Sequence, residues 1–364
     1  MSKGINYSHA CLTEKVASIR TTGITALGPA TLVSIAMAGE LGNGASVVVC
    51  TDGISNLGVG NIQDIKRKKA TQDEVDDFYD KIADYANLKG VSVSLTSIQG
   101  EECDLETLMT LSDKTGGNVD IIDPSLAEDH FKNLVTSKTI ATKVNVKIVL
   151  HKALEFKNES EKNLNPQKNI LTKNLGNVID SSEITFSYKI KDSEELKKIE
   201  GFNIETLNEI PFQCAIEYTT LDGKKCIRTI TQVLKTSDDI EEVKKDANMG
   251  ILAVTAAHQA TNLVREGKFR EAQAYSMNNK RYMKNNLKSD NDKRKYKAYK
   301  GSMKGMYGQI HEQNNLEEMQ MAPMMGDSKD TAPTKNKKGF FSKMNDALSS
   351  NIVKQSRFTS ANLN

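Results

Sequence analysis

Three short apolar runs in the first third of the chain alternate with segments that have helical spacing. The runs are of strand length and rich in β-branched residues: 46–50, 91–98 and 118–122. A helix is predicted from Thr71, because Thr71 and Glu74 have the spacing of a capping box. A second helix is predicted over 104–114, before Gly116 and Gly117. Strands that alternate with helices predict an α/β unit with a parallel sheet.

The apolar pattern changes from Thr139 onward. Three runs alternate with period two, which is typical of half-buried antiparallel strands: Val144, Val146, Ile148 and Leu150; Ile184, Phe186, Tyr188 and Ile190; Phe212, Cys214, Ile216 and Tyr218. Asp222-Gly223 joins the last run to a fourth at 226–233, and this dipeptide favours a tight hairpin turn. We therefore expect an antiparallel β-sandwich over 138–236, with the charged stretches 158–168 and 191–199 as loops or a short helix.

The following region has helical spacing. A helix is predicted from Asp238, with Glu241 completing a capping box, up to Glu266 and Gly267. A second helix starts at Lys268, so 237–312 is expected to form a helical hairpin. His258 falls on the apolar face of the first helix, where we expect a hydrogen-bonded core histidine.

From residue 313 the composition indicates a disordered tail over 313–364. Within it, several apolar residues approximate one face of a helix: Phe340, Phe341, Met344, Leu348, Ile352 and Val353. Lysines at 335, 337, 338, 343 and 354 add positive charge. Such a helix is able to bind a partner's groove or an anionic membrane surface.

Composition limits the classes of function. The formal net charge is only +2, so the chain as a whole is not expected to bind nucleic acid, and the basic stretch 280–304 is interpreted as a solvated helix. No apolar run approaches a membrane span and the N-terminus has no signal-peptide core, so we expect a cytoplasmic protein. The five cysteines lack zinc-site spacing, and Cys50 and Cys214, on predicted strands, are expected to be buried.

The candidate chemistry lies at the end of the first strand. The apolar run 47–50 ends in Thr51-Asp52-Gly53, and Thr25 begins a second segment, Thr25-Ala-Leu-Gly-Pro-Ala. The two segments resemble the C-terminal part of the von Willebrand factor A domain. The resemblance implies that Thr25 and Asp52 are the second-loop and third-loop ligands of a metal-ion-dependent adhesion site. Thr25 is also suited to cap the helix that follows, and Asp52 to a turn.

The first metal loop of that family, Asp-x-Ser-x-Ser, does not occur in this sequence. The site is therefore degenerate: two protein oxygens leave Mg²⁺ mostly to water, so we expect weak Mg²⁺ binding at most and no other cofactor. In the family, the strand that carries this loop lies beside the strand that ends in Asp52. Residues 1–137 then form a truncated, doubly wound A domain with an apolar strand edge that lacks its neighbour.

An open edge predicts self-association or completion by a strand from a partner. Three origins stay open: a truncated gene product, a half completed by a partner, or a degenerate descendant. The order of A domain, β-sandwich and helices resembles the inner coat subunits of transport vesicles and A-domain RING ubiquitin ligases. Because no nucleophile, base pair or cofactor loop is evident, we expect a non-enzymatic scaffold that binds proteins. The alternatives are a substrate-recruiting fragment of such a ligase and a vesicle-coat-like component.

Overall fold

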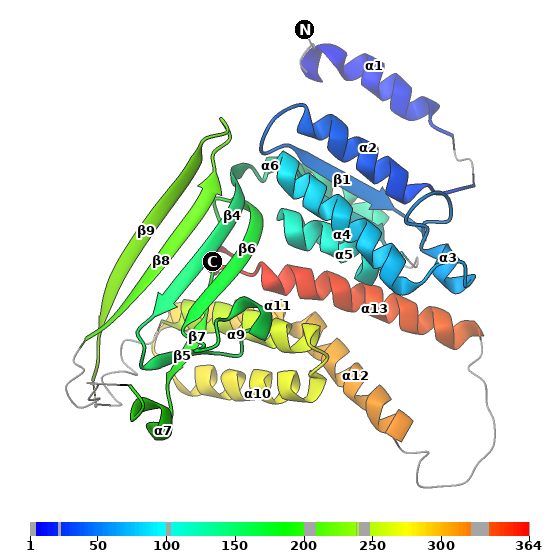
Figure 1. Cartoon of the computed structure of the whole chain (residues 1–364). Coiled ribbons are helices and arrows are strands. Elements are labelled where there is room, and N and C mark those ends of the chain that lie inside the picture. Colours follow the sequence, from blue (N-terminus) through cyan, green and yellow to red (C-terminus); the bar gives the residue numbers. More distant parts are fainter. Residues whose placement is uncertain are drawn as a thin grey trace.

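A three-stranded parallel sheet forms the first part of the molecule (Figure 1). The computed structural model describes residues 5–20, 23–99, 103–199, 209–237, 239, 248–321 and 335–363. The strands are β1 (Ser46–Thr51), β2 (Ser92–Ile98) and β3 (Val119–Ile122), in the order β1-β2-β3. All neighbours are parallel, with Val49 opposite Leu95 and Leu95 opposite Val119. The predicted α/β unit is confirmed.

Helices surround this sheet, and their ends follow the local sequence signals. They are α1 (Ile5–Ser18), α2 (Leu27–Gly39), α3 (Gln63–Lys66), α4 (Gln72–Lys89), α5 (Leu105–Thr115) and α6 (Ala127–Thr136), with a 3-10 turn at Pro124–Leu126. Thr71 and Glu74 form the predicted capping box at the start of α4. Gly116 ends α5 with φ +81°, a left-handed conformation that glycine adopts without strain.

Two antiparallel sheets make up the middle of the chain. The larger has the order β6-β4-β8-β9, formed by β4 (Thr139–Leu150), β6 (Ile170–Ile179), β8 (Glu209–Thr219) and β9 (Lys225–Lys235). The smaller pairs β5 (Leu154–Lys157) with β7 (Ser187–Ile190).

The ring of Phe186 lies 5.5 Å from Phe156 and 6.4 Å from Phe212, so aromatic side chains join the two sheets in one core. The antiparallel character and the hairpin at Asp222-Gly223 are confirmed. The stretches predicted as loops or a short helix hold a 3-10 turn (Glu161–Asn163) and α7 (Ser193–Leu196), but β5 and β6 were not predicted.

The C-terminal part contains more helices than the predicted hairpin. They are α9 (Met249–Arg265), α10 (Phe269–Asn285), α11 (Asp290–Ser302), α12 (Lys304–Met321), α13 (Lys335–Ser356) and a 3-10 turn (Ser360–Leu363). Asn248 caps α9, its side-chain oxygen accepting from the N–H groups of Gly250 and Ile251. The predicted caps Asp238 and Glu241 lie outside the described residues.

The prediction of a disordered tail is wrong where the structure describes it. Helix α12 continues to Met321, and α13 runs between α5 and the helices α9 and α12 (Figure 1). Val353 of α13 joins the core around the parallel sheet, whereas Leu348 and Ile352 join the core of the helical layer. This part of the predicted apolar face is therefore occupied by the chain itself.

Among the residues that the structure describes, no helix is both long enough and apolar enough to cross a bilayer.

Candidate functional site

Thr25 and the loop that carries Asp52 meet at the C-terminal end of β1. The Thr25 N–H donates to the side-chain oxygen of Asn56 at 2.7 Å, and the Thr25 carbonyl accepts from the N–H groups of Asn56 (3.0 Å) and Leu57 (3.2 Å). Asp52 is exposed in the bend between β1 and Gly53. The segments of the two residues thus lie at the edge of the sheet where open α/β folds place ligands.

Thr25 is not the cap of α2. The helix starts at Leu27 and its N-cap is Ala26, with no side-chain cap hydrogen bond. Instead, the backbone N–H of Thr25 donates to the side chain of Asn56, which lies in the loop after β1. The capping prediction fails because this tertiary contact fixes the entry to the helix.

Metal ligation at this edge stays a prediction. In the described ranges, no group of three or more His, Cys, Asp or Glu side chains is placed to hold a metal ion. Thr25 and Asp52 offer at most three side-chain oxygens. Mg²⁺ takes about six oxygen ligands, so water would have to supply the others.

Strand β1 is exposed on the face of the sheet that carries the Cys50 side chain. Cys50 was expected to be buried, but it is exposed, whereas Thr96, its partner in β2, is fully buried. The difference comes from α6: the ring nitrogen Nε2 of His130 lies 3.1 Å from the Thr96 hydroxyl, so α6 covers β2 on this face. Partial burial, and secondarily the charge of Asp52, raise the pKa of the Cys50 thiol. Cys214, also expected to be buried, is half-buried.

Helix α2 is apolar on both sides but buried on only one. No charged residue occurs between Leu27 and Gly39, and Leu27 and Ile35 face the core. On the other side, Val33 is 57% exposed and Met37 is 69% exposed. A helix that is hydrophobic all round is normally covered all round. We call the edge of β1 with Cys50, together with Val33 and Met37 of α2, the open surface.

His258 is the core histidine that the sequence predicts. Its Nδ1 accepts from the Thr185 hydroxyl and its Nε2 donates to the Phe358 carbonyl, both at 2.8 Å. Burial lowers the pKa of His258 to about 4, so the imidazole is neutral at pH 7. It joins α9 to the β5–β7 side of the molecule and to the C-terminus, which is a structural role.

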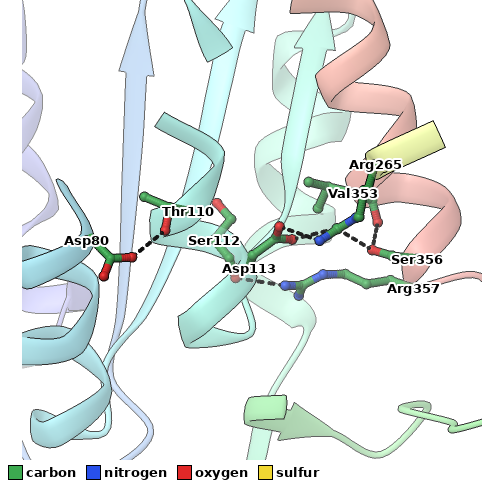
Figure 2. A network of polar contacts seen from close by, with 8 residues as sticks. All are labelled: Asp80, Thr110, Ser112, Asp113, Arg265, Val353, Ser356 and Arg357. Carbon is green, nitrogen blue, oxygen red and sulfur yellow. Dashed lines mark hydrogen bonds and ion pairs between the residues drawn. The ribbon is translucent and has the colours of Figure 1, made fainter. Parts of the chain in front are cut away.

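The sequence did not predict a polar network that joins α5 to α9 and to the end of α13. Arg265 of α9 binds both carboxylate oxygens of Asp113 at 2.8 and 2.9 Å, and also reaches Ser356 (Figure 2). Arg357 donates to the carbonyls of Ser112, at 2.8 Å, and Gly116. These contacts join residues far apart in the sequence, so no local spacing indicates them.

Comparison with known proteins supports the fold. No family model matches the sequence. Circularly permutated Ras protein 1 of Dictyostelium discoideum is 31% identical over 265 residues, which cover 72% of this chain and 29% of that protein. This chain thus spans less than a third of the relative's length.

Solved structures extend the comparison. The human COPII-coat protein Sec24c matches 98% of this chain with a TM-score of 0.59 and 13% identity, over 47% of its own chain. The ArnB paralog VWA2 from Sulfolobus acidocaldarius matches 93% of this chain, over 72% of its own, with a TM-score of 0.36 and 13% identity. The likeness to Sec24c is one of fold. It agrees with a partial A-domain-like sheet followed by antiparallel sheets and helices.

Proposed function

We propose that this chain is a non-enzymatic scaffold that binds another polypeptide through the open surface. The observation that carries the proposal is the exposed apolar side of α2 beside a strand edge that, in the described residues, has no neighbour. A partner strand would pair with β1, and its flanking residues would cover Val33 and Met37. Burying each of these half-exposed side chains would contribute about 1 kcal/mol.

The comparisons support a scaffold in two ways. The fold of a COPII-coat protein matches 98% of this chain, over 47% of the coat protein's own length, and a coat is an assembly of proteins. The matched relative is more than three times longer than the aligned part, so a strand for β1 has two possible sources, the same longer polypeptide or a second protein. A vesicle-coat-like component is the second candidate because of the Sec24c likeness. The RING-ligase alternative stays a prediction that no observation favours.

The degenerate metal site belongs to the same proposal. Asp52 lies at the end of β1, so a bound partner would also lie against it. We propose that recognition depends on strand pairing and apolar contact, with Mg²⁺ contributing little.

Sedimentation velocity of Met37→Glu tests the open surface. The parent chain is expected to self-associate, because its apolar surface has no cover, and Met37→Glu should shift it towards monomer while the circular dichroism spectrum stays unchanged. Met277→Glu is the matched control, since Met277 is 50% exposed on α10 and far from β1. A parent chain that is monomeric with slow amide exchange in β1 would contradict the proposal, as would an equal effect of Met277→Glu.

A further inference from the structure

Strand β9 leaves a second, longer sheet edge open. All of its positions pair with β8 in one continuous antiparallel register, from Lys225 opposite Thr219 to Lys235 opposite Glu209. It is the last strand in the order β6-β4-β8-β9, and no strand of the described residues lies on its other side (Figure 1). Edge strands are usually protected by bulges, proline or inward charges, and β9 has neither a bulge nor a proline.

The side chains of β9 are suited to a neighbouring strand on both faces. Ile230 lies opposite Cys214, on the side of the core, and is still exposed. On the other face, Ile227 is 64% exposed and Val233 is 50% exposed. β-branched side chains on a pleated surface gain packing when a cross-strand partner is added.

The charge of β9 indicates what that partner strand carries. Its charged residues are all basic, Lys225, Arg228 and Lys235, and none of the three forms an ion pair within the part of the chain that the structure describes. Elsewhere in these sheets lysines are paired, as Lys189 is with Glu155 at 2.8 Å and Lys173 with Glu159 at 2.8 Å. Acidic side chains on an incoming strand would pair with these three cations, of which Lys235 also has Glu209 opposite it in β8.

The hairpin that presents β9 is held in place at its tip. The Thr220 N–H donates to the Lys224 carbonyl at 2.9 Å, and Gly223, with φ +86°, closes the turn. Leu221 packs on Gly44 in the loop before β1, where any side chain at position 44 would collide with it. The edge is therefore preorganised, which lowers the entropic cost of adding a strand.

We propose that the edge of β9 binds an extended acidic peptide segment of another protein by adding a strand to the antiparallel sheet. This site is separate from the open surface. A second copy of the chain is disfavoured as the occupant, because pairing of two β9 strands along their full length would set Lys225 against Lys235 and bring only positive charges together.

Fluorescence anisotropy with two labelled peptides tests the proposal. The acidic probe is as long as β9, alternates valine and threonine, and carries glutamates at the positions that face Lys225, Arg228 and Lys235 in antiparallel register. The second probe has lysines in place of the glutamates. The acidic probe should bind, and Arg228→Glu should weaken its binding about three- to tenfold, since a favourable cross-strand pair becomes a repulsive one.

Lys147→Glu is the matched control, because Lys147 is an exposed cation of the same sheet but lies on the interior strand β4. This variant should bind the acidic probe as the parent does. Hydrogen exchange should show that the acidic probe protects amides of 225–235, and N-methylation of alternate probe amides should abolish both binding and protection, because it removes the ladder hydrogen bonds.

Four outcomes would overturn the proposal: equal binding of both probes, loss of binding in Lys147→Glu to the same extent, unchanged binding of the N-methylated probe, or protection in the chain alone of the β9 amides that point away from β8. Protection of 225–235 that increases with protein concentration in the absence of peptide would assign the edge to a second copy instead.

Discussion

Asp346 of α13 and Arg357, the residue that follows this helix, bind opposite ends of α5. The Asp346 carboxylate accepts from the N–H groups of Cys103 at 2.8 Å and Leu105 at 2.5 Å, at the start of the helix. Arg357 donates to the carbonyls of Ser112 and Gly116, at its end. An anion at the N-terminus and a cation at the C-terminus are the arrangement that the helix dipole favours. Asp346 thus replaces a local side-chain cap at the start of α5, whereas Arg357 adds to the local cap that Gly116 forms at its end.

The start of α5 explains why an outside cap is needed. Asp104 occupies the N-cap position in a left-handed conformation, with φ +54°, and its side chain makes no cap hydrogen bond. Asp346, which is buried, accepts from the N–H of Leu105 in the first turn and from the N–H of Cys103 just before the helix. The fold of the first region therefore depends on the far end of the chain.

Replacing Asp346 by asparagine should destabilise the protein by about 1–3 kcal/mol. The amide keeps the shape of the carboxylate but turns an N–H donor towards the N–H groups of Cys103 and Leu105, which leaves a buried donor unsatisfied. Urea unfolding of Asp346→Asn at pH 7 measures the change. Asn345→Ala, one residue away and exposed, is the control, with an effect within about 0.5 kcal/mol. Equal stability of Asp346→Asn and the parent would show that α5 does not need this cap.

Replacing Arg357 by lysine should also destabilise the protein, by about 1–3 kcal/mol. A guanidinium reaches two carbonyls at once, whereas an ammonium on a flexible stem reaches one and is harder to desolvate. Burial lowers the pKa of Arg357 to about 10. Chemical denaturation is the measurement, with Lys354→Arg, at an exposed position near the end of α13, as the control. A loss of stability in Arg357→Lys no larger than in that control would contradict the assignment.

Local sequence patterns predicted the three strands of the parallel sheet. The strands β1, β2 and β3 were located within a residue of their observed ends, because each is a short apolar run bounded by turn residues. Strand β6 was missed because its sequence does not alternate cleanly and contains Gly176. That glycine is required where β6 passes the end of α5, since a side chain there would collide with the carbonyl of Lys114.

Contacts between residues far apart in the sequence explain the features that were not predicted. Cys50 was expected to be buried because a free thiol on a strand behaves as a small hydrophobe, yet on that face of the sheet α6 covers Thr96 of β2 and leaves Cys50 exposed. Helix α13 looked like a tail because Asp346 and Arg357 find their partners more than 200 positions away. At the candidate site, the sequence located Thr25 and Asp52 at one edge of the sheet, but it did not predict Asn56, which joins their loops.

The Mg²⁺ affinity of the chain should be weak, in the millimolar range or above. Thr25 and Asp52 supply at most three side-chain oxygens, so at least about half of the hydration shell stays on the ion and little binding energy is gained. Isothermal titration calorimetry with Mg²⁺ measures the affinity, with Asp52→Ala as the comparison. Micromolar binding that Asp52→Ala abolishes would show that the site is complete, with ligands beyond these two.

Replacing Asp104 by asparagine should stabilise the protein at pH 7. Burial, and then the charges of Asp346 and Glu106, raise the pKa of Asp104 from 3.8 to about 6. The folded state therefore binds this proton more tightly than the unfolded state, so this group lowers the free energy of unfolding as the pH rises from about 4 to 6. Asparagine carries no charge and tolerates the left-handed conformation, so the expected gain is about 1–3 kcal/mol at pH 7.

The pH dependence separates this effect from a general change in packing. The gain of Asp104→Asn should shrink as the pH falls below 6 and approach zero only near pH 3, which is below both the folded pKa of about 6 and the unfolded value of 3.8. Urea unfolding of both proteins at about pH 7, 5 and 3 measures the change. His258, with its pKa lowered to about 4, destabilises the fold on acidification, but it does so in both proteins and cancels in their difference. Asp129→Asn, an exposed carboxylate on α6, is the control and should change little at any pH. A gain that is the same at all three pH values would mean that backbone preference, and not charge, is responsible.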